Sequence, residues 1–63
     1  MEKRIKIHKV TIVGRDGNII LDRKGERELL IADAYVIVYY DISGSSDGTL
    51  IPMWNIDHMN FLE

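Results

Sequence analysis

The side chains with the clearest binding chemistry are cations near the N-terminus. Arg4, Lys6 and His8 alternate along the chain, so a β-strand would place them on one face, with Lys9 beside them. Phosphate groups need clustered cations, so this stripe predicts an anionic ligand, either a nucleic acid or a small nucleotide. An isoelectric point near 5.6 argues against nucleic acid as the main partner. Lysines that protect a solvated strand edge are the competing interpretation.

Side chains for catalysis or metal binding are sparse. The chain has no cysteine, and its two histidines, His8 and His58, are far apart and lack ligand-spaced neighbours. No serine or threonine stands next to a histidine, and Asp57 and His58 would point to opposite faces of a strand. We therefore expect a protein that is not an enzyme and that needs neither a metal nor a cofactor.

The charges are divided along the chain. All eight lysines and arginines precede Glu28, whereas the segment from Glu28 onward carries six acids and no lysine or arginine. This division could create a basic face, or let the basic edge of one subunit meet the acidic edge of another. The two halves could equally neutralise each other within one molecule, and the sequence leaves these alternatives open.

The length of 63 residues predicts a single domain over residues 1–63 with about one core. Domains of this size bury only about 60% of the surface that the unfolded chain exposes. Without cysteines, efficient packing or association with a partner must supply the stability. No stretch approaches the roughly 18 apolar residues of a membrane span, and no signal peptide is recognisable. We therefore expect a cytoplasmic protein without membrane contacts.

Turn signals at short intervals favour an all-β fold, a small five-stranded meander. Glycine-containing turn sequences occur at 14–18, 22–26 and 43–49. The runs between them are rich in β-branched and aromatic residues, and they predict strands at 5–13, 18–22, 28–41, 49–54 and 58–63.

Residues 26–34 are open to two interpretations. They contain several good helix formers, so a short helix is an alternative to a strand. The segment leads directly into a β-branched and aromatic run without a helix cap or a breaker, which favours the strand. Asp33, between two alanines, could mark a bend.

The apolar residues of the first predicted strand change from one face of the strand to the other. Ile5 and Ile7 share one face, whereas Val10 and Ile12 share the other. A β-bulge near residues 8–9 would keep all four side chains in the core, and it would also bend the strand around a small barrel.

Residues 35–40 read YVIVYY and have no polar face. A strand that is apolar on both faces must be covered on both, and this chain has material for about one core. A second copy of the chain is the simplest cover. We therefore expect a homo-oligomer interface formed by Tyr35, Val36, Ile37, Val38, Tyr39 and Tyr40. The alternative is that the tyrosine hydroxyls reach water at a rim, so that only one face of the strand is buried.

The C-terminal segment reads GTLIPMW, NIDH and MNFLE, and it predicts a strand, a single helical turn near residues 55–58 and a short last strand. This ending resembles the close of small SH3-like and Sm-like β-barrels, in which the turn seals the open end and the last strand returns to the first. The resemblance implies an SH3-like barrel. It implies no particular ligand, because neither an RNA-contact motif nor the acidic cluster of SH3 domains is present.

Trp54 is expected chiefly in the core, with an interface or a ligand groove as the alternative. Exposed tyrosines and Trp54 would suit a protein partner, because tyrosine and tryptophan dominate binding hot spots. The sequence thus predicts a small binding module that self-associates through residues 35–40 and acts on a protein partner as a regulator or inhibitor. A binder of anionic ligands through the N-terminal strand is the alternative.

Overall fold

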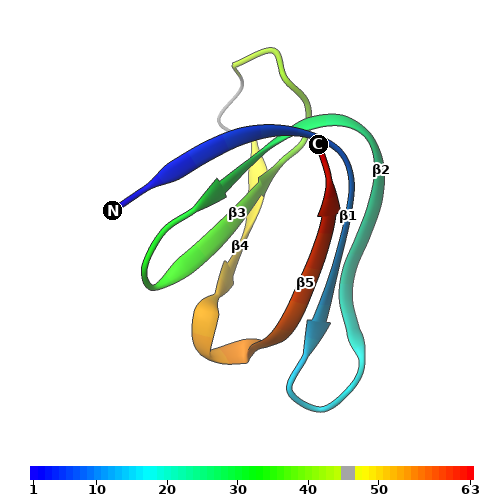
Figure 1. The fold of residues 1–63 in the computed structure, drawn as a ribbon, viewed down its shortest axis with the longest axis vertical. Coiled ribbons are helices and arrows are strands. Elements are labelled where there is room, and N and C mark those ends of the chain that lie inside the picture. The colour runs from blue at the N-terminus through cyan, green and yellow to red at the C-terminus, as the bar shows by residue number, and fades with distance from the viewer. Residues whose placement is uncertain (45–46) are drawn as a thin grey trace.

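The computed structural model describes residues 1–44 and 47–63, and most of these residues lie in β-strands (Figure 1). One antiparallel sheet has the order β4-β3-β2-β1-β5. A single 3-10 turn, η1, precedes the last strand. The elements are β1 (Lys3–Gly14), β2 (Ile19–Ile31), β3 (Tyr35–Tyr39), β4 (Gly48–Pro52), η1 (Met53–Asn55) and β5 (Ile56–Leu62). This confirms the all-β class, the five strands and the single helical turn, which begins slightly earlier than predicted.

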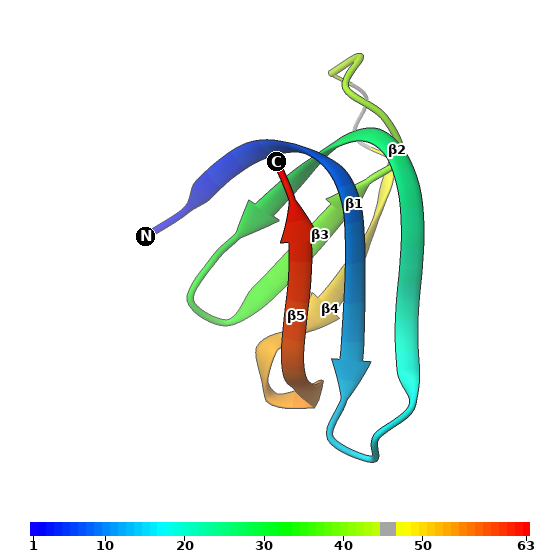
Figure 2. The same ribbon diagram turned by 45° about the vertical axis from the view of Figure 1, so that its right-hand side comes forward.

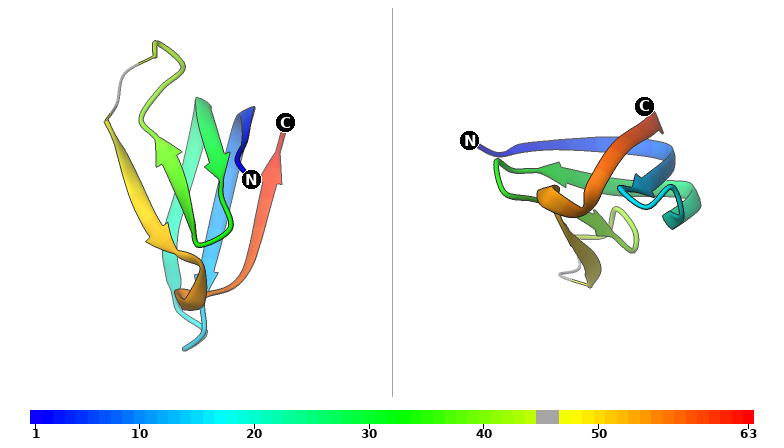
Figure 3. Two further views of the ribbon diagram at one scale, coloured as in Figure 1. Left: turned by 90° about the vertical axis from the view of Figure 1, so that its left-hand side faces the viewer. Right: turned by 90° about the horizontal axis from the view of Figure 1, so that it is seen from below.

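The sheet curls around its own inner face because β1 and β2 are long, bent strands (Figures 2 and 3). The first part of β1 and the second part of β2 belong to one half of the sheet, together with β3 and β4. The second part of β1 pairs with β5 from Lys9 to Gly14. The last strand therefore returns to the first, as the barrel resemblance implies.

The bend in β1 and β2 coincides with a β-bulge. Ile7 pairs with Arg27 and Lys9 pairs with Lys24, so one residue of β1 faces two residues of β2. Gly25 lies at this point with a φ of 108°, a left-handed value that glycine adopts without strain. The irregularity predicted in β1 is confirmed, and the extra residue belongs to β2.

Two predicted boundaries are wrong. Residues 22–26 do not form a turn, since β2 runs through them and the bulge accommodates Gly25. The chain reverses instead at residues 32–34, where the backbone N–H of Ala32 donates to the carbonyl of Tyr35 at 2.9 Å. The segment 26–34 is therefore strand up to Ile31 and then a tight turn, not a helix.

The core lies inside the curled sheet and is wholly apolar. Among the residues that the structure describes, no polar or charged residue is buried. The bulge turns Ile7 and Val10 inward together, and both are fully buried. The buried cluster consists of Ile7, Val10, Ile12, Leu21, Leu29, Val36, Val38 and Ile51.

The hairpin turn between β1 and β2 is organised by Asp16. Its carboxylate accepts hydrogen bonds from the backbone N–H of Asn18 at 3.0 Å and from the side-chain amide of Asn18 at 3.2 Å. These bonds favour the charged form and hold the pKa of Asp16 below its ordinary value. Gly17 supplies the positive φ of 85° that the turn requires.

The lowered pKa of Asp16 predicts a pH dependence of stability. Its contribution is fully present above the ordinary pKa of 3.8 and is lost as the pH falls through the lower pKa of the folded state. We expect Asp16→Ala to weaken the protein at neutral pH and to make acid unfolding less steep in this window. Urea unfolding at a series of pH values tests this, and equal pH profiles for both proteins would contradict it.

The bulge predicts a backbone cost at Gly25. A Cβ there would meet only the Arg27 guanidinium, at 3.7 Å, so there is space for it, but the φ of 108° strains any other residue. We expect Gly25→Ala to lower the free energy of unfolding by about 1–3 kcal/mol. Lys24→Ala, in the same strand, should change it by less than about 0.5 kcal/mol. Equal losses in the two variants, measured by urea unfolding, would refute the strain argument.

Candidate functional site

The outer side of β3 is apolar and partly exposed. Val36 and Val38 point inward and are buried, whereas Tyr35, Ile37 and Tyr39 alternate with them and are half-buried. Tyr40 follows the strand and is 74% exposed. This corrects the expected interface. Val36 and Val38 belong to the core, so only the outward residues of β3 can meet a second molecule.

The outward residues of β3 continue into neighbouring strands. Ile37 pairs with Leu30 on β2 and with Leu50 on β4, and paired residues lie on the same face of a sheet. Leu50 is 56% exposed, although Leu30 is buried. We call the surface formed by Tyr35, Ile37, Tyr39 and Leu50 the tyrosine face. None of the strands described in residues 1–44 and 47–63 packs over it as a second layer.

Arg4 lies at the rim of the tyrosine face. Its guanidinium carbon is 4.4 Å from the centre of the Tyr39 ring, and its Nε is 3.4 Å from a carboxylate oxygen of Glu28. On the same side, the hydroxyl of Tyr35 donates to Glu2 at 3.4 Å. Arg4 therefore makes a cation–π contact and an ion pair within the molecule, and both would compete with an anionic ligand.

The predicted cationic stripe is accompanied by acids. Arg4, Lys6, His8 and Lys9 are all exposed, as predicted. Lys6 pairs in register with Glu28, however, and His8 Nε2 lies 3.7 Å from Glu26. At its far end, the N-terminal amine is 2.9 Å from Asp33. The basic and acidic halves of the chain thus neutralise each other in part, which weakens the case for a phosphate-binding surface.

Trp54 is 71% exposed, so the expectation that it lies mainly in the core is wrong. The 3-10 turn directs Met53 and, after it, Ile56 toward the core, and it leaves Trp54 outside. Arg15 fixes this turn, since its side chain donates to the carbonyl of Trp54 and its backbone N–H donates to Asn55 at 3.3 Å. An exposed indole on a held turn is well suited to contact a partner.

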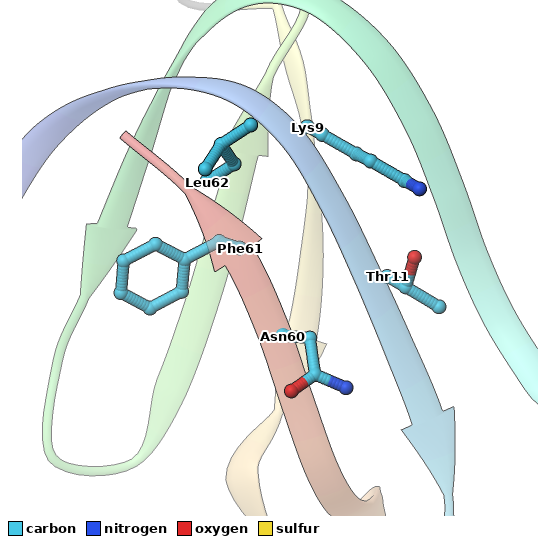
Figure 4. A pocket seen from close by; sticks show the side chains of 5 residues that line it. All are labelled: Lys9, Thr11, Asn60, Phe61 and Leu62. Atoms are coloured by element: carbon cyan, nitrogen blue, oxygen red, sulfur yellow. The ribbon is translucent and has the colours of Figure 1, made fainter.

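A hollow of about 330 Å³ lies across β1 and β5, and sequence reasoning did not find it (Figure 4). Lys9 and Thr11 line it from β1, and Asn60, Phe61 and Leu62 line it from β5. The hydroxyl of Thr11 donates to Asp22 at 3.0 Å and is thereby occupied. The hollow exists only because β5 pairs with β1, and no local sequence motif indicates that pairing.

A second hollow, of about 200 Å³, lies between β2 and the start of β4. Arg23 and Arg27 line it, but both guanidinium groups donate to nearby carbonyls. Arg27 donates to Lys24 at 2.8 Å and to Gly25 at 3.4 Å, so its side chain holds the backbone of the bulge. We therefore assign Arg27 a structural role.

The residues with catalytic or metal-binding potential stay dispersed. In the described part of the chain, no three histidine or acidic side chains gather into a metal site. Asp57 and His58 do meet, at 2.9 Å between Oδ2 and Nδ1, contrary to the expectation that they point apart. Both side chains are more than half exposed at the free edge of β5, where they can bend around the strand. Of the loop predicted at 43–49, Ser45 and Ser46 lie outside the described residues.

Similarity to known proteins gives no guidance. The chain matches no protein-family model, no curated protein and no solved structure. Within the described ranges, no helix has the length and apolar character to span a membrane.

The exposure of Trp54 predicts that its side chain contributes little to stability. We expect Trp54→Ala to change the free energy of unfolding by less than about 0.5 kcal/mol. Ile51→Val removes only one methylene from the buried core and should cost about 0.5–1.5 kcal/mol. Urea unfolding followed by circular dichroism compares the two. A larger loss for Trp54→Ala would show that its ring is packed.

Proposed function

We propose that the protein is a small, non-enzymatic binding module that self-associates through the tyrosine face and acts on a protein partner. The observation that carries this proposal is the apolar row of Leu30, Ile37 and Leu50 on the outer side of the sheet. Leu50 stands at the open end of this row with 56% of its surface exposed. Adjoining apolar side chains that stay partly exposed, as Ile37 and Leu50 do, support an interaction site here.

The charge distribution supports a second copy as the cover of the tyrosine face. The face is bordered by β1, with Arg4 and Lys6, and by β4, whose flanking segment 40–52 has acids but no lysine or arginine. A two-fold axis parallel to the strands lays β1 of one copy over β4 of the other. Opposite charges then meet at both rims, which favours this pairing over random contacts.

The size of the molecule also supports self-association. A standard interface buries roughly 800 Å² on each partner. That is about a fifth of the 4260 Å² that the chain exposes, so one face of the sheet could provide it. Burial of this surface would add to a core of only eight clustered side chains.

The protein partner is proposed to contact exposed aromatic residues that lie outside the tyrosine face. Trp54 on η1 and Tyr40 after β3 are each more than 70% exposed. Their large, stiff side chains provide contact area at little cost in conformational entropy. Binding through them would suit a regulator or inhibitor. A chain without cysteine needs no oxidising compartment, and we propose that it acts in the cytoplasm.

Self-association through the tyrosine face predicts that Leu50→Glu gives a monomer, because the variant buries a charge in the interface. The matched control is Ile19→Glu. Ile19 is 62% exposed and starts β2, where it pairs with Val13 at the far end of the β1–β2 hairpin. Native mass spectrometry and sedimentation give the subunit number, and circular dichroism confirms the fold. An unchanged oligomer for Leu50→Glu, or a monomeric wild type, would refute this interface.

A further inference from the structure

The first half of β1 has a partner strand on one side only. β1 pairs with β2 from Lys3 onward, but β5 ends at Leu62, opposite Lys9. In the sheet described for residues 1–44 and 47–63, the segment Lys3–His8 has no strand along its other side. We call this segment the β1 edge; Figures 1 and 2 show it at the rim of the sheet. Since the residues of a strand direct their backbone groups to alternate sides, about half of these groups face away from β2.

The charge around the β1 edge selects the kind of strand that could join it. Residues 3–9 carry four lysines and arginines and no acid, whereas the facing residues 24–31 carry two acids and two bases. The two segments together have a net charge of +4, even with the ion pair between Arg4 and Glu28. Such an edge repels a basic strand, including another copy of itself, and attracts an acidic one.

The side chains of the β1 edge alternate in character. Ile7 is buried and Ile5 is half-buried on the core side, whereas Arg4, Lys6 and His8 are exposed on the outer side. A strand added here would place its own alternate residues beside these two sets. Apolar residues would extend the core, and acidic residues would lie beside the cations. About six residues, or roughly 20 Å of strand, would fill the place.

We propose that the β1 edge binds an extended, acidic segment of the protein partner by β-strand addition. This inference rests on the proposed binding function and specifies the chemistry of the partner, a strand in which acidic and apolar residues alternate. The added strand continues the line of β5, so its end lies next to the hollow formed by Lys9, Thr11, Asn60 and Leu62. Backbone hydrogen bonds supply the affinity, and the cations select the sequence.

The test is a binding titration with a labelled six-residue peptide of alternating glutamate and valine, capped at both ends. We expect it to bind the wild type, and we expect a peptide of alternating lysine and valine not to bind. Lys6→Glu should weaken binding about tenfold, because it replaces attraction by repulsion. The matched control Lys24→Glu makes the same change of net charge on β2, with β1 between it and the free side of the edge, and should keep binding within about twofold. In two further peptides, every second backbone nitrogen is methylated, starting at the first residue in one peptide and at the second residue in the other. One of these two peptides should not bind, because its methyl groups replace the N–H groups that face β1.

Several results would overturn the proposal. These are no binding of the glutamate peptide at millimolar concentration, equal binding of both methylated peptides, or equal effects of Lys6→Glu and Lys24→Glu. Displacement by a single-stranded oligonucleotide at equal concentration would assign the edge to nucleic acid. The subunit number is measured in the same samples. If the wild type is an oligomer that does not bind the peptide, only this inference is refuted. If the wild type is a monomer that binds the peptide, only the tyrosine-face interface is refuted.

Discussion

The fold depends on one constraint, that two long strands must bend at the same place. A chain of 63 residues can enclose a core with a single sheet only if the sheet closes partly on itself. The bulge meets this need, because Gly25 adopts a backbone conformation that other residues avoid and lets β2 carry one residue more than β1. Arg27 then donates to the carbonyls of Lys24 and Gly25 and holds the bent backbone. The inward side chains on both sides of the bend consequently meet in one core.

The same bend determines which surfaces stay open. It turns the first half of β1 away from β5, so β5 pairs only with the second half and the β1 edge keeps one free side. It also carries β3 and β4 to the end of the sheet, where their outer side has no second layer among the described elements. The tyrosine face and the β1 edge are therefore consequences of how a very short chain makes a core. Their side chains are apolar on the tyrosine face and cationic on the β1 edge, and on this difference we base the proposal of different partners.

The sequence predicted the number and class of the elements better than their limits. Turn residues and β-branched runs report local geometry, so the all-β class and the phase change in β1 could be predicted. The sequence around Gly25 predicts a turn, because a positive φ serves turns and bulges equally and only the pairing with β1 distinguishes them. The actual turn at 32–34 has two alanines and no glycine, so it carries little signal. These two errors cancelled in the strand count. The prediction of a core position for Trp54 is wrong because hydrophobicity does not show which residue of a 3-10 turn points outward.

Arg4 connects the two proposed binding surfaces. Its backbone belongs to the β1 edge, whereas its guanidinium lies over Tyr39 and beside Glu28 at the rim of the tyrosine face. An acidic side chain that draws Arg4 toward the edge must weaken these two contacts and uncover the Tyr39 ring. A second copy that covers the tyrosine face would instead hold Arg4 over the ring and away from the edge. Because coupling between two binding events is reciprocal, each event then changes the affinity of the other by the same factor. If both proposed surfaces are used, Arg4, which crosses from one to the other, would link assembly and partner binding thermodynamically.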